Sequence, residues 1–220
     1  MCKHNSWSDQ YQRRRDAARS FGRIFSLPLV KRVRDVLLDC VRDHARVLEV
    51  GAGDHRMGEL LRRRRAGIEY RSLDIDPNGE HDYHDFADLA HRFDCVFAFE
   101  VVEHVAFDEL PAWLRNLSDA LEPGGRLLLS TPNTYYPPAY LRDASHRTPL
   151  CYDELAGLVA GAGLDVSRIV RVYHDPIHRA FLRRYLFGWL FRLIGIDFAR
   201  QIVLVAVKPG SLQLPRERPL

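Results

Sequence analysis

A carboxylate beside a pair of glycines is the first chemical feature of this sequence. Glu49 stands two residues before Gly51, and Gly51 and Gly53 flank Ala52. Glycines let a ligand approach the main chain closely because they carry no side chain. The neighbouring carboxylate would repel a pyrophosphate, but it suits a ligand that carries an ammonium or a sulfonium group. The dinucleotide fingerprint also needs a glycine at its sixth position, where this chain has Arg56. The pattern therefore argues against NAD.

A second acid follows the glycines at the sequence spacing that is typical of a ribose-binding residue. Asp74 follows Gly51 by 23 positions, in a stretch that Pro77 closes. In nucleotide-binding folds, an acid about 20 residues beyond the glycine turn accepts hydrogen bonds from the ribose hydroxyls. We therefore expect Asp74 to bind a ribose, and Asp76 to serve as a turn or capping residue.

Two acids and a histidine follow a later apolar stretch at helical spacing. Glu100, Glu103 and His104 stand at positions i, i+3 and i+4, so they share a face once a helix has begun. Joined by His146, they could hold a divalent metal that lowers the pKa of an acceptor group. Alternatively, His104 and His146 act as general bases that take the acceptor's proton. A capped helix with a structural histidine is the third interpretation.

Strands and helices in alternation are needed to bring these residues together. Apolar runs typical of strands occur at 47–50, 68–75, 93–99, 126–131, 164–173 and 202–207. Helical patterns between them follow the glycines and recur at 107–121 and 152–163. This order predicts a doubly wound α/β fold, which binds ligands at the carboxyl ends of its strands.

Three stretches together resemble class I S-adenosylmethionine-dependent methyltransferases. They are hydrophobic-Glu-hydrophobic-Gly-x-Gly at 48–53, Leu-Asp-Ile-Asp-Pro at 73–77, and the run FDCVFAFEVVEHV followed by LEPGGRLLLSTPN. The last run is similar to the small-molecule group that includes the ubiquinone-biosynthesis O-methyltransferases. The resemblance covers residues 47–163. It implies a Rossmann-like fold whose sheet is mostly parallel, with an antiparallel last strand.

The resemblance also implies S-adenosylmethionine as the cofactor. In the resembling family an acid meets the adenine amino group, and the next apolar residue packs on the ring. Asp85 and Phe86 are similarly placed, at the end of a short edge strand expected from His81, although Asp82 and Asp88 compete for the acid's role. The residues expected to bind the cofactor are Glu49, Gly51, Ala52, Gly53, Asp74, Ile75, Asp85, Phe86 and Glu100.

The metal interpretation also has a parallel among known families. E-x-x-E-H followed by S-T-P-N and a later histidine resembles the metal site of small-RNA 3′-terminal 2′-O-methyltransferases. A similar EVxEH occurs in ubiquinone-type O-methyltransferases, and many members of that group have these residues and no metal. A divalent ion on Glu100, Glu103, His104 and His146 therefore remains one of the open alternatives.

A single methyltransferase domain over residues 1–220 accounts for these patterns. Residues 27–173 and 201–208 form its core, which starts with a helix that Pro28 opens. Residues 1–26, rich in arginine and aromatics, form a helical arm on the core or a lid over the site. Residues 123–125 read as a turn, and the prolines at 137–138 predict an irregular linker over the strand ends.

Residues 174–200 form a helical insertion in this domain. Apolar side chains recur at steps of four through 181–194, and arginines mark the rest of the helix's circumference. The helix is too short and too charged to span a bilayer. It is either a core or dimer helix, or an interfacial helix that contacts a membrane surface or a lipid-linked substrate.

Composition sets the broad class. The chain has 220 residues, a formal net charge of +3 and four cysteines far apart in the sequence. This mild basicity does not by itself argue for nucleic acid, and no recognised RNA-binding module is present. Separated cysteines and the lack of a signal peptide predict a cytoplasmic protein, with peripheral membrane association as an option. The sequence gives no indication of oligomeric state.

These inferences converge on an S-adenosylmethionine-dependent methyltransferase that O-methylates a small-molecule, lipid-linked or sugar acceptor. Two alternatives stay open. One is an RNA 3′-terminal 2′-O-methyltransferase with a divalent metal, and the other is a catalytically silent methyltransferase-like binding module. The intact Glu49, Gly51, Gly53 and Asp74 argue against the silent module.

Overall fold

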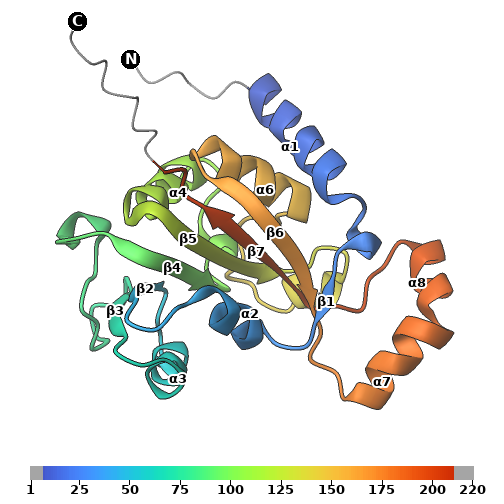
Figure 1. Ribbon diagram of the computed structural model, residues 1–220. Helices are drawn as coiled ribbons and strands as arrows, with labels where there is room; N and C mark the ends of the chain where they lie inside the picture. The colour runs from blue at the N-terminus through green and yellow to red at the C-terminus, as the bar shows by residue number, and fades with distance from the viewer. Residues whose placement is uncertain (1–6, 211–220) are drawn as a thin grey trace, which may run out of the picture.

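The computed structural model describes residues 7–210 as a seven-stranded sheet with helices packed against it (Figure 1). The strands lie in the order β1-β6-β7-β5-β4-β2-β3, and within this sheet only β7 runs against its neighbours. The strands are β1 Leu29–Val30, β2 Arg46–Val50, β3 Glu69–Leu73, β4 Phe93–Phe99, β5 Leu121–Pro132, β6 Asp165–Val172 and β7 Gln201–Val207. The helices are α1 Trp7–Phe21, α2 Val33–Cys40, α3 Arg56–Arg64, α4 Leu110–Asp119, α5 Pro137–Leu141, α6 Tyr152–Gly161, α7 Ile177–Phe181 and α8 Gly188–Ile194. The predicted doubly wound α/β fold with an antiparallel last strand is confirmed.

Alternating side chains give the sheet two apolar faces. On β2, Leu48 and Val50 belong to one buried cluster, and Val47 belongs to the other. Helices α4 and α6 contribute to the first cluster, and α2 and α3 contribute to the second. Because both faces are tightly packed, the loops at the carboxyl ends of the strands are held in fixed relative positions.

The segment after Pro28 forms a strand before it forms a helix, which corrects the predicted helix start. Leu29–Val30 is the edge strand β1 and pairs in parallel with β6. The carbonyls of Pro28 and Val30 accept hydrogen bonds from N–H groups on that edge, at 2.8 and 3.1 Å. Main-chain pairing thus outweighs the preference of proline for a first helical position, and α2 begins only at Val33.

Two segments predicted as irregular or turning adopt regular structure. Pro137 and Pro138 occupy the first turn of α5, where the missing N–H group of proline is not needed. Residues 123–125 lie within β5, whose pairing with β4 shifts register between Phe93 and Cys95. Gly124 permits this irregularity, because it adopts a φ of +81°.

The edge strand expected from His81 shrinks to a single bridge between Tyr83 and Leu73. Asp82 replaces further main-chain pairing, because one of its carboxylate oxygens accepts hydrogen bonds from the N–H and the hydroxyl of Ser72 at 2.8 and 3.0 Å. The other oxygen accepts from Arg71 at 2.9 Å. Asp82 therefore helps to hold this segment against β3.

The insertion contains two short helices instead of the single helix that its period of four predicts. Helix α7 runs into a π-helical turn at Leu182–Leu186, and α8 begins after Phe187. A π turn bonds over five residues, so it breaks the period of four. Both helices stand away from the sheet at the lower right of Figure 1. Among residues 7–210, no helix is long and apolar enough to cross a bilayer.

Helix α1 packs on α6. The Arg14 guanidinium Nε donates to Asp153 at 3.0 Å, and the Tyr152 hydroxyl donates to the carbonyl of Gly22 at 2.5 Å. Gly157 permits the close approach, since a Cβ there would lie 2.9 Å from the main-chain nitrogen of Arg14. These contacts favour the arm over the lid for the described part of residues 1–26.

A buried ion pair ties the end of the insertion to the sheet. Arg171 Nη1 lies 2.9 Å from Asp197 Oδ1, and both side chains are almost fully buried. Asn133, at the end of β5, donates to the other Asp197 oxygen at 2.9 Å. Arg171 also donates to the carbonyls of Leu27 and Phe25, which precede β1. One network therefore joins β5, β6, the segment before β1 and the chain that returns from α8.

Candidate active site

The glycine turn after β2 has the backbone that its sequence predicts. Gly51 and Gly53 adopt φ angles of +72° and +46°, which side chains disfavour. A Cβ on Gly51 would lie 2.4 Å from a methyl carbon of Val101. The N–H of Gly53 donates to the Asp74 carboxylate at 3.0 Å. Asp74 is thus placed against the glycine turn, as its spacing predicts.

A cavity of about 690 Å³ opens beside this turn. Its lining includes Glu49, Gly51, Ala52, Gly53 and Glu100, which were all expected to bind the cofactor. The remaining expected residues lie outside that lining. Ile75 is exposed, and Asp85 caps the 3₁₀ turn Phe86–Asp88 by accepting from the N–H of Ala87 at 2.9 Å. Asp76 accepts from the N–H of Asn78 at 2.9 Å, in the turn role expected of it.

Tyr70 and Gly58 are residues of this site that the sequence analysis missed. The Tyr70 hydroxyl donates to Glu49 Oε2 at 2.6 Å, and both side chains are buried. Burial raises the pKa of Glu49 to about 7, while the bond from Tyr70 acts in the opposite direction. A Cβ on Gly58 would lie 2.3 Å from the Tyr70 ring, so the glycine makes room for the tyrosine. The sequence signal that could have indicated this contact is Gly58, a glycine that does not fit the positions of the dinucleotide fingerprint.

A second cavity, of about 510 Å³, adjoins the first. Its lining includes His104, Tyr136, Arg142, His146 and Arg200. Glu100, His174 and Gln201 line both cavities, so the two meet at these side chains. His174 Nε2 and Gln201 Oε1 are 2.8 Å apart, where the insertion leaves the sheet and returns to it. The sequence analysis missed this contact because it joins the two ends of that insertion.

Glu100 stands at the junction in a conformation that a non-glycine residue rarely adopts. Its φ is +56°, and its N–H donates to Ser130 Oγ at 3.0 Å. The same hydroxyl donates back to Glu100 Oε1 at 2.9 Å. Burial raises the pKa of the Glu100 carboxyl above its usual range. Such strained backbone concentrates at functional sites, where the surrounding structure holds it in place.

An acid and two imidazoles converge on one side of the second cavity. The ligand atoms of Glu103, His104 and His146 all lie within 4.8 Å of one another. Glu103 is fully buried, and within the described structure neither of its carboxylate oxygens has a hydrogen-bond partner. Its burial and the nearby Glu100 raise its pKa to about 8. A buried carboxyl without partners is costly and fits a site that binds a cation.

The imidazole of His146 is oriented for such a site. Its Nδ1 donates to the carbonyl of Tyr140 at 2.7 Å, which leaves Nε2 for a second contact. Nε2 lies 4.0 Å from Glu103 Oε1 and 3.9 Å from Asp143 Oδ2. A carbonyl that fixes the second ring nitrogen is the usual support of a metal-binding histidine. The predicted helical face is wrong, however. Glu103 and His104 lie on a 3₁₀ turn at Val102–His104 and α4 begins only at Leu110, so Glu100 stands outside the close group.

Comparison with known proteins identifies the family of this chain. A family model described as a methyltransferase domain matches residues 11–169. The chain belongs to this methyltransferase family. Its methyl donor is S-adenosylmethionine, and a second molecule must serve as methyl acceptor.

Curated relatives of this methyltransferase include two ubiquinone biosynthesis O-methyltransferases. That of Azorhizobium caulinodans is 28% identical over 165 residues, which cover 60% of this chain and 63% of the relative. That of Methylobacterium nodulans is 33% identical over 127 residues, which cover 50% of this chain and 46% of the relative. The chain thus spans less than two thirds of either one.

A solved structure supports the fold. The S-adenosylmethionine-dependent methyltransferase of Archaeoglobus fulgidus superposes with a TM-score of 0.59 at 17% sequence identity. The match covers 80% of this chain and 94% of that protein. At this identity the likeness concerns the fold alone.

Proposed function

We propose that this methyltransferase O-methylates a small-molecule, lipid-linked or sugar acceptor. The observation that carries the proposal is the meeting of two cavities at Glu100, His174 and Gln201. The cavity beside the glycine turn is the place for the donor, and the cavity beside His104 and His146 is the place for the acceptor. The curated relatives, which are named as O-methyltransferases, support an oxygen as the methylated atom.

The reaction is an in-line displacement at the methyl carbon. Glu49 would face the ammonium of the donor, the main chain of Gly51, Ala52 and Gly53 would lie along it, and Asp74 would accept from the ribose hydroxyls. We place Ile75, Asp85 and Phe86 toward the adenine side. The acceptor oxygen forms a bond to the methyl carbon as the carbon–sulfur bond breaks, which leaves neutral S-adenosylhomocysteine. If no ion is held there, His104 or His146 would take the proton that the acceptor hydroxyl loses.

Glu103, His104 and His146 are proposed to hold a divalent ion, with Glu100 at its border. The group of one carboxylate and two imidazoles suits ions that accept mixed oxygen and nitrogen ligands. When bound, the ion would lower the pKa of the acceptor hydroxyl. The buried Glu103 without partners supports this proposal.

A methyl-transfer assay with a panel of hydroxyl acceptors tests the proposed reaction. We expect turnover of phenolic, lipid-linked or sugar hydroxyls with release of S-adenosylhomocysteine. Because the acid and histidine group also supports the RNA alternative, the panel includes an RNA oligonucleotide with a free 3′-terminal 2′-hydroxyl. Turnover of the RNA alone would replace our proposal, and cofactor binding without turnover of any acceptor would favour the silent binding module.

Replacing Asp74 with alanine should lower the affinity for S-adenosylhomocysteine about ten-fold or more. Two ribose hydroxyls would lose a charged acceptor, and a hydrogen bond to a charged group is worth about 1.5–3 kcal/mol. Isothermal titration calorimetry measures the change. Asp76→Ala is the matched control, since Asp76 is two residues away and bonds its own turn. An equal loss in both variants, or normal affinity in a folded Asp74→Ala protein, would contradict the assignment.

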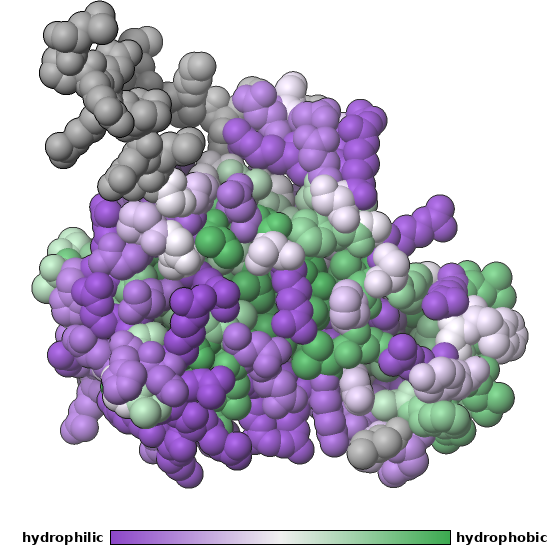
Figure 2. Space-filling view, in the orientation of Figure 1, coloured by the Kyte–Doolittle hydropathy of each residue, from purple (hydrophilic) through white to green (hydrophobic). Residues whose placement is uncertain are grey.

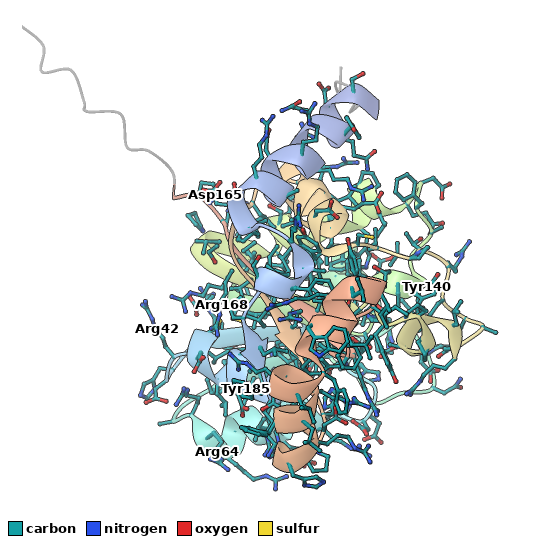
Figure 3. The ribbon with its side chains drawn as sticks, turned by 90° about the vertical axis from the view of Figure 1, so that its right-hand side faces the viewer. Arg42, Arg64, Tyr140, Asp165, Arg168 and Tyr185 are labelled. Carbon is teal, nitrogen blue, oxygen red and sulfur yellow. The ribbon has the colours of Figure 1, made fainter. Side chains whose placement is uncertain are left out.

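We further propose that residues 181–194 contact an anionic membrane surface. Figure 2 shows apolar side chains over α7 and α8, and in Figure 3 Tyr185 lies on the insertion, which faces the viewer. The exposed large apolar residues here are Phe181, Leu182, Tyr185, Leu186, Phe187, Trp189, Leu190, Leu193 and Ile194. The sequence from 176 to 196 carries four arginines and no acid. Arg179 and Arg183 pair with Asp175, which precedes this stretch, and the side chains of Arg184 and Arg192 are exposed. Apolar and basic side chains together suit an anionic membrane interface.

A second copy of the chain fits this surface less well. A two-fold interface brings the same patch of both copies together, so arginine would face arginine. The insertion also begins and ends at the acceptor cavity, because His174 and Gln201 line it. Membrane contact would therefore bring a lipid-linked acceptor to the cavity. The free thiols of Cys40, Cys95 and Cys151 are consistent with the proposed location, peripheral and cytoplasmic.

Trp189→Glu should release the protein from anionic vesicles. The substitution places a negative charge on the exposed apolar surface, where it opposes both burial and attraction to the headgroups. Flotation with vesicles of phosphatidylcholine and phosphatidylglycerol at low salt measures binding. Phe107→Glu, an exposed aromatic residue ahead of α4, is the control that should still float. A wild-type protein that stays at the bottom as a stable dimer would support the dimer helix instead.

A further inference from the structure

We infer that Tyr70 is a positioning residue for cofactor binding, whose hydroxyl holds Glu49 ionised and aimed at the positively charged end of the donor. The inference rests on the proposed role of Glu49 in the donor cavity. Tyr70 does not line that cavity, so it would act through Glu49 and not by touching the cofactor.

The geometry around Tyr70 fixes its hydroxyl in one place. The hydroxyl lies 2.6 Å from Glu49 Oε2 and 3.4 Å from His55 Nδ1. The Arg62 guanidinium stands over the ring, 4.8 Å from its centroid. Gly58 leaves room for the ring on α3, because any Cβ at this position would overlap it. The ring is thus confined, and its hydroxyl cannot follow Glu49 elsewhere.

The electrostatic surroundings of Glu49 make the bond from Tyr70 important. Burial pushes the Glu49 carboxyl toward its neutral form, with a pKa of about 7, and the negative charges of Asp54 and Asp74 push in the same direction. The bond from Tyr70 favours the carboxylate instead, and a smaller contribution in the same direction comes from the main-chain N–H of Gly58. The other charged or titratable side chains around the cavity are Arg32, Arg34, His55, Arg56, Arg62, Glu100 and His174. Near neutral pH, the bond from the Tyr70 hydroxyl therefore shifts the equilibrium between neutral and ionised Glu49 toward the ionised form.

This arrangement explains why position 58 is a glycine. A third glycine is expected two residues earlier in a dinucleotide fold, where it packs the helix beneath a pyrophosphate. Here the glycine instead admits a tyrosine that supports a carboxylate. Glu49, Gly58 and Tyr70 thus form one unit for a cationic ligand, spread over β2, α3 and β3.

Calorimetric titration with S-adenosylhomocysteine between pH 6 and 8 tests the inference. It compares the wild type, Tyr70→Phe, Glu49→Gln and the double variant, so that the titration of the ligand itself cancels. In the wild type, affinity should rise with pH as Glu49 ionises. Tyr70→Phe should move this rise upward by about one pH unit. Affinity should then fall about five-fold at pH 7 and less than about two-fold at pH 8.

In the Glu49→Gln background, adding Tyr70→Phe should change affinity less than about two-fold, because no carboxylate remains to be held. Tyr152→Phe is the matched control, since it also loses a hydroxyl bond but far from the cavity, to the carbonyl of Gly22. A Tyr70→Phe loss that is equal at every pH, or equally large in the Glu49→Gln background, would overturn the inference alone. Absence of binding by the wild type at every pH would overturn the proposed function itself.

Discussion

Replacing Asp197 with alanine is expected to lower the free energy of unfolding by about 3–5 kcal/mol, the usual cost of breaking a buried ion pair. The variant leaves the Arg171 guanidinium charged and buried without its partner. It also removes the acceptor of the Phe198 N–H and one of the two acceptors of the Asn133 amide, which keeps the carbonyl of Ala199. Urea unfolding followed by circular dichroism measures the loss as a lower midpoint at unchanged slope.

Two controls separate the buried pair from charge removal in general. Glu59→Ala breaks the exposed pair with Arg63 on α3 and should cost less than about 1 kcal/mol. The double variant Arg171→Met with Asp197→Leu should recover most of the stability, since well-packed apolar side chains often replace a buried pair without loss. An Asp197→Ala protein as stable as Glu59→Ala would show that the network contributes little.

Removing divalent ions should reduce methyl transfer at least about a hundred-fold and leave the binding of S-adenosylhomocysteine intact. The ion is proposed to act on the acceptor, and lowering the pKa of a hydroxyl near a metal is worth several kcal/mol. Radiolabel transfer after dialysis against chelator measures activity, and calorimetry measures cofactor binding. Adding back magnesium or manganese should restore turnover.

Variants of the metal group sharpen this prediction. His146→Ala should weaken manganese binding at least about ten-fold and raise the metal concentration needed for half activity. His91→Ala, a histidine ahead of β4 and outside the close group of Glu103, His104 and His146, should leave both unchanged. Full activity in excess chelator would end the metal proposal. His104 and His146 would then be examined as general bases through the pH dependence of the rate.

The parts of the site that sequence could predict are those encoded by near neighbours. Glu49, at the end of β2, and Gly51 and Gly53, in the turn after it, lie within five residues of one another. The strand that precedes Asp74 is identified by its own apolar pattern. Prediction from sequence failed where contacts between segments far apart in the chain determine the structure. Whether Tyr70 and Glu49 share a buried environment depends on the pairing of β2 with β3. His174 meets Gln201 only because the insertion closes on itself.

The misplaced elements have a similar origin. The spacing of Glu100, Glu103 and His104 is the same in a helix and in a turn that precedes one, so it could not reveal that α4 starts at Leu110. The main-chain bonds that turn residues 29–30 into a strand come from β6, far along the chain. The spacing of four between apolar residues likewise does not reveal the π turn that divides the insertion.

The position of β7 has a consequence for how the protein is made. β7 lies between β5 and β6, yet a ribosome synthesises it after both. Until residues 201–207 emerge, β5 and β6 have no partner on their facing edges, and unpaired edges invite association between chains. Nascent chains that stall within the insertion should therefore depend on chaperones, and they should become soluble and protease-resistant only once β7 has been added.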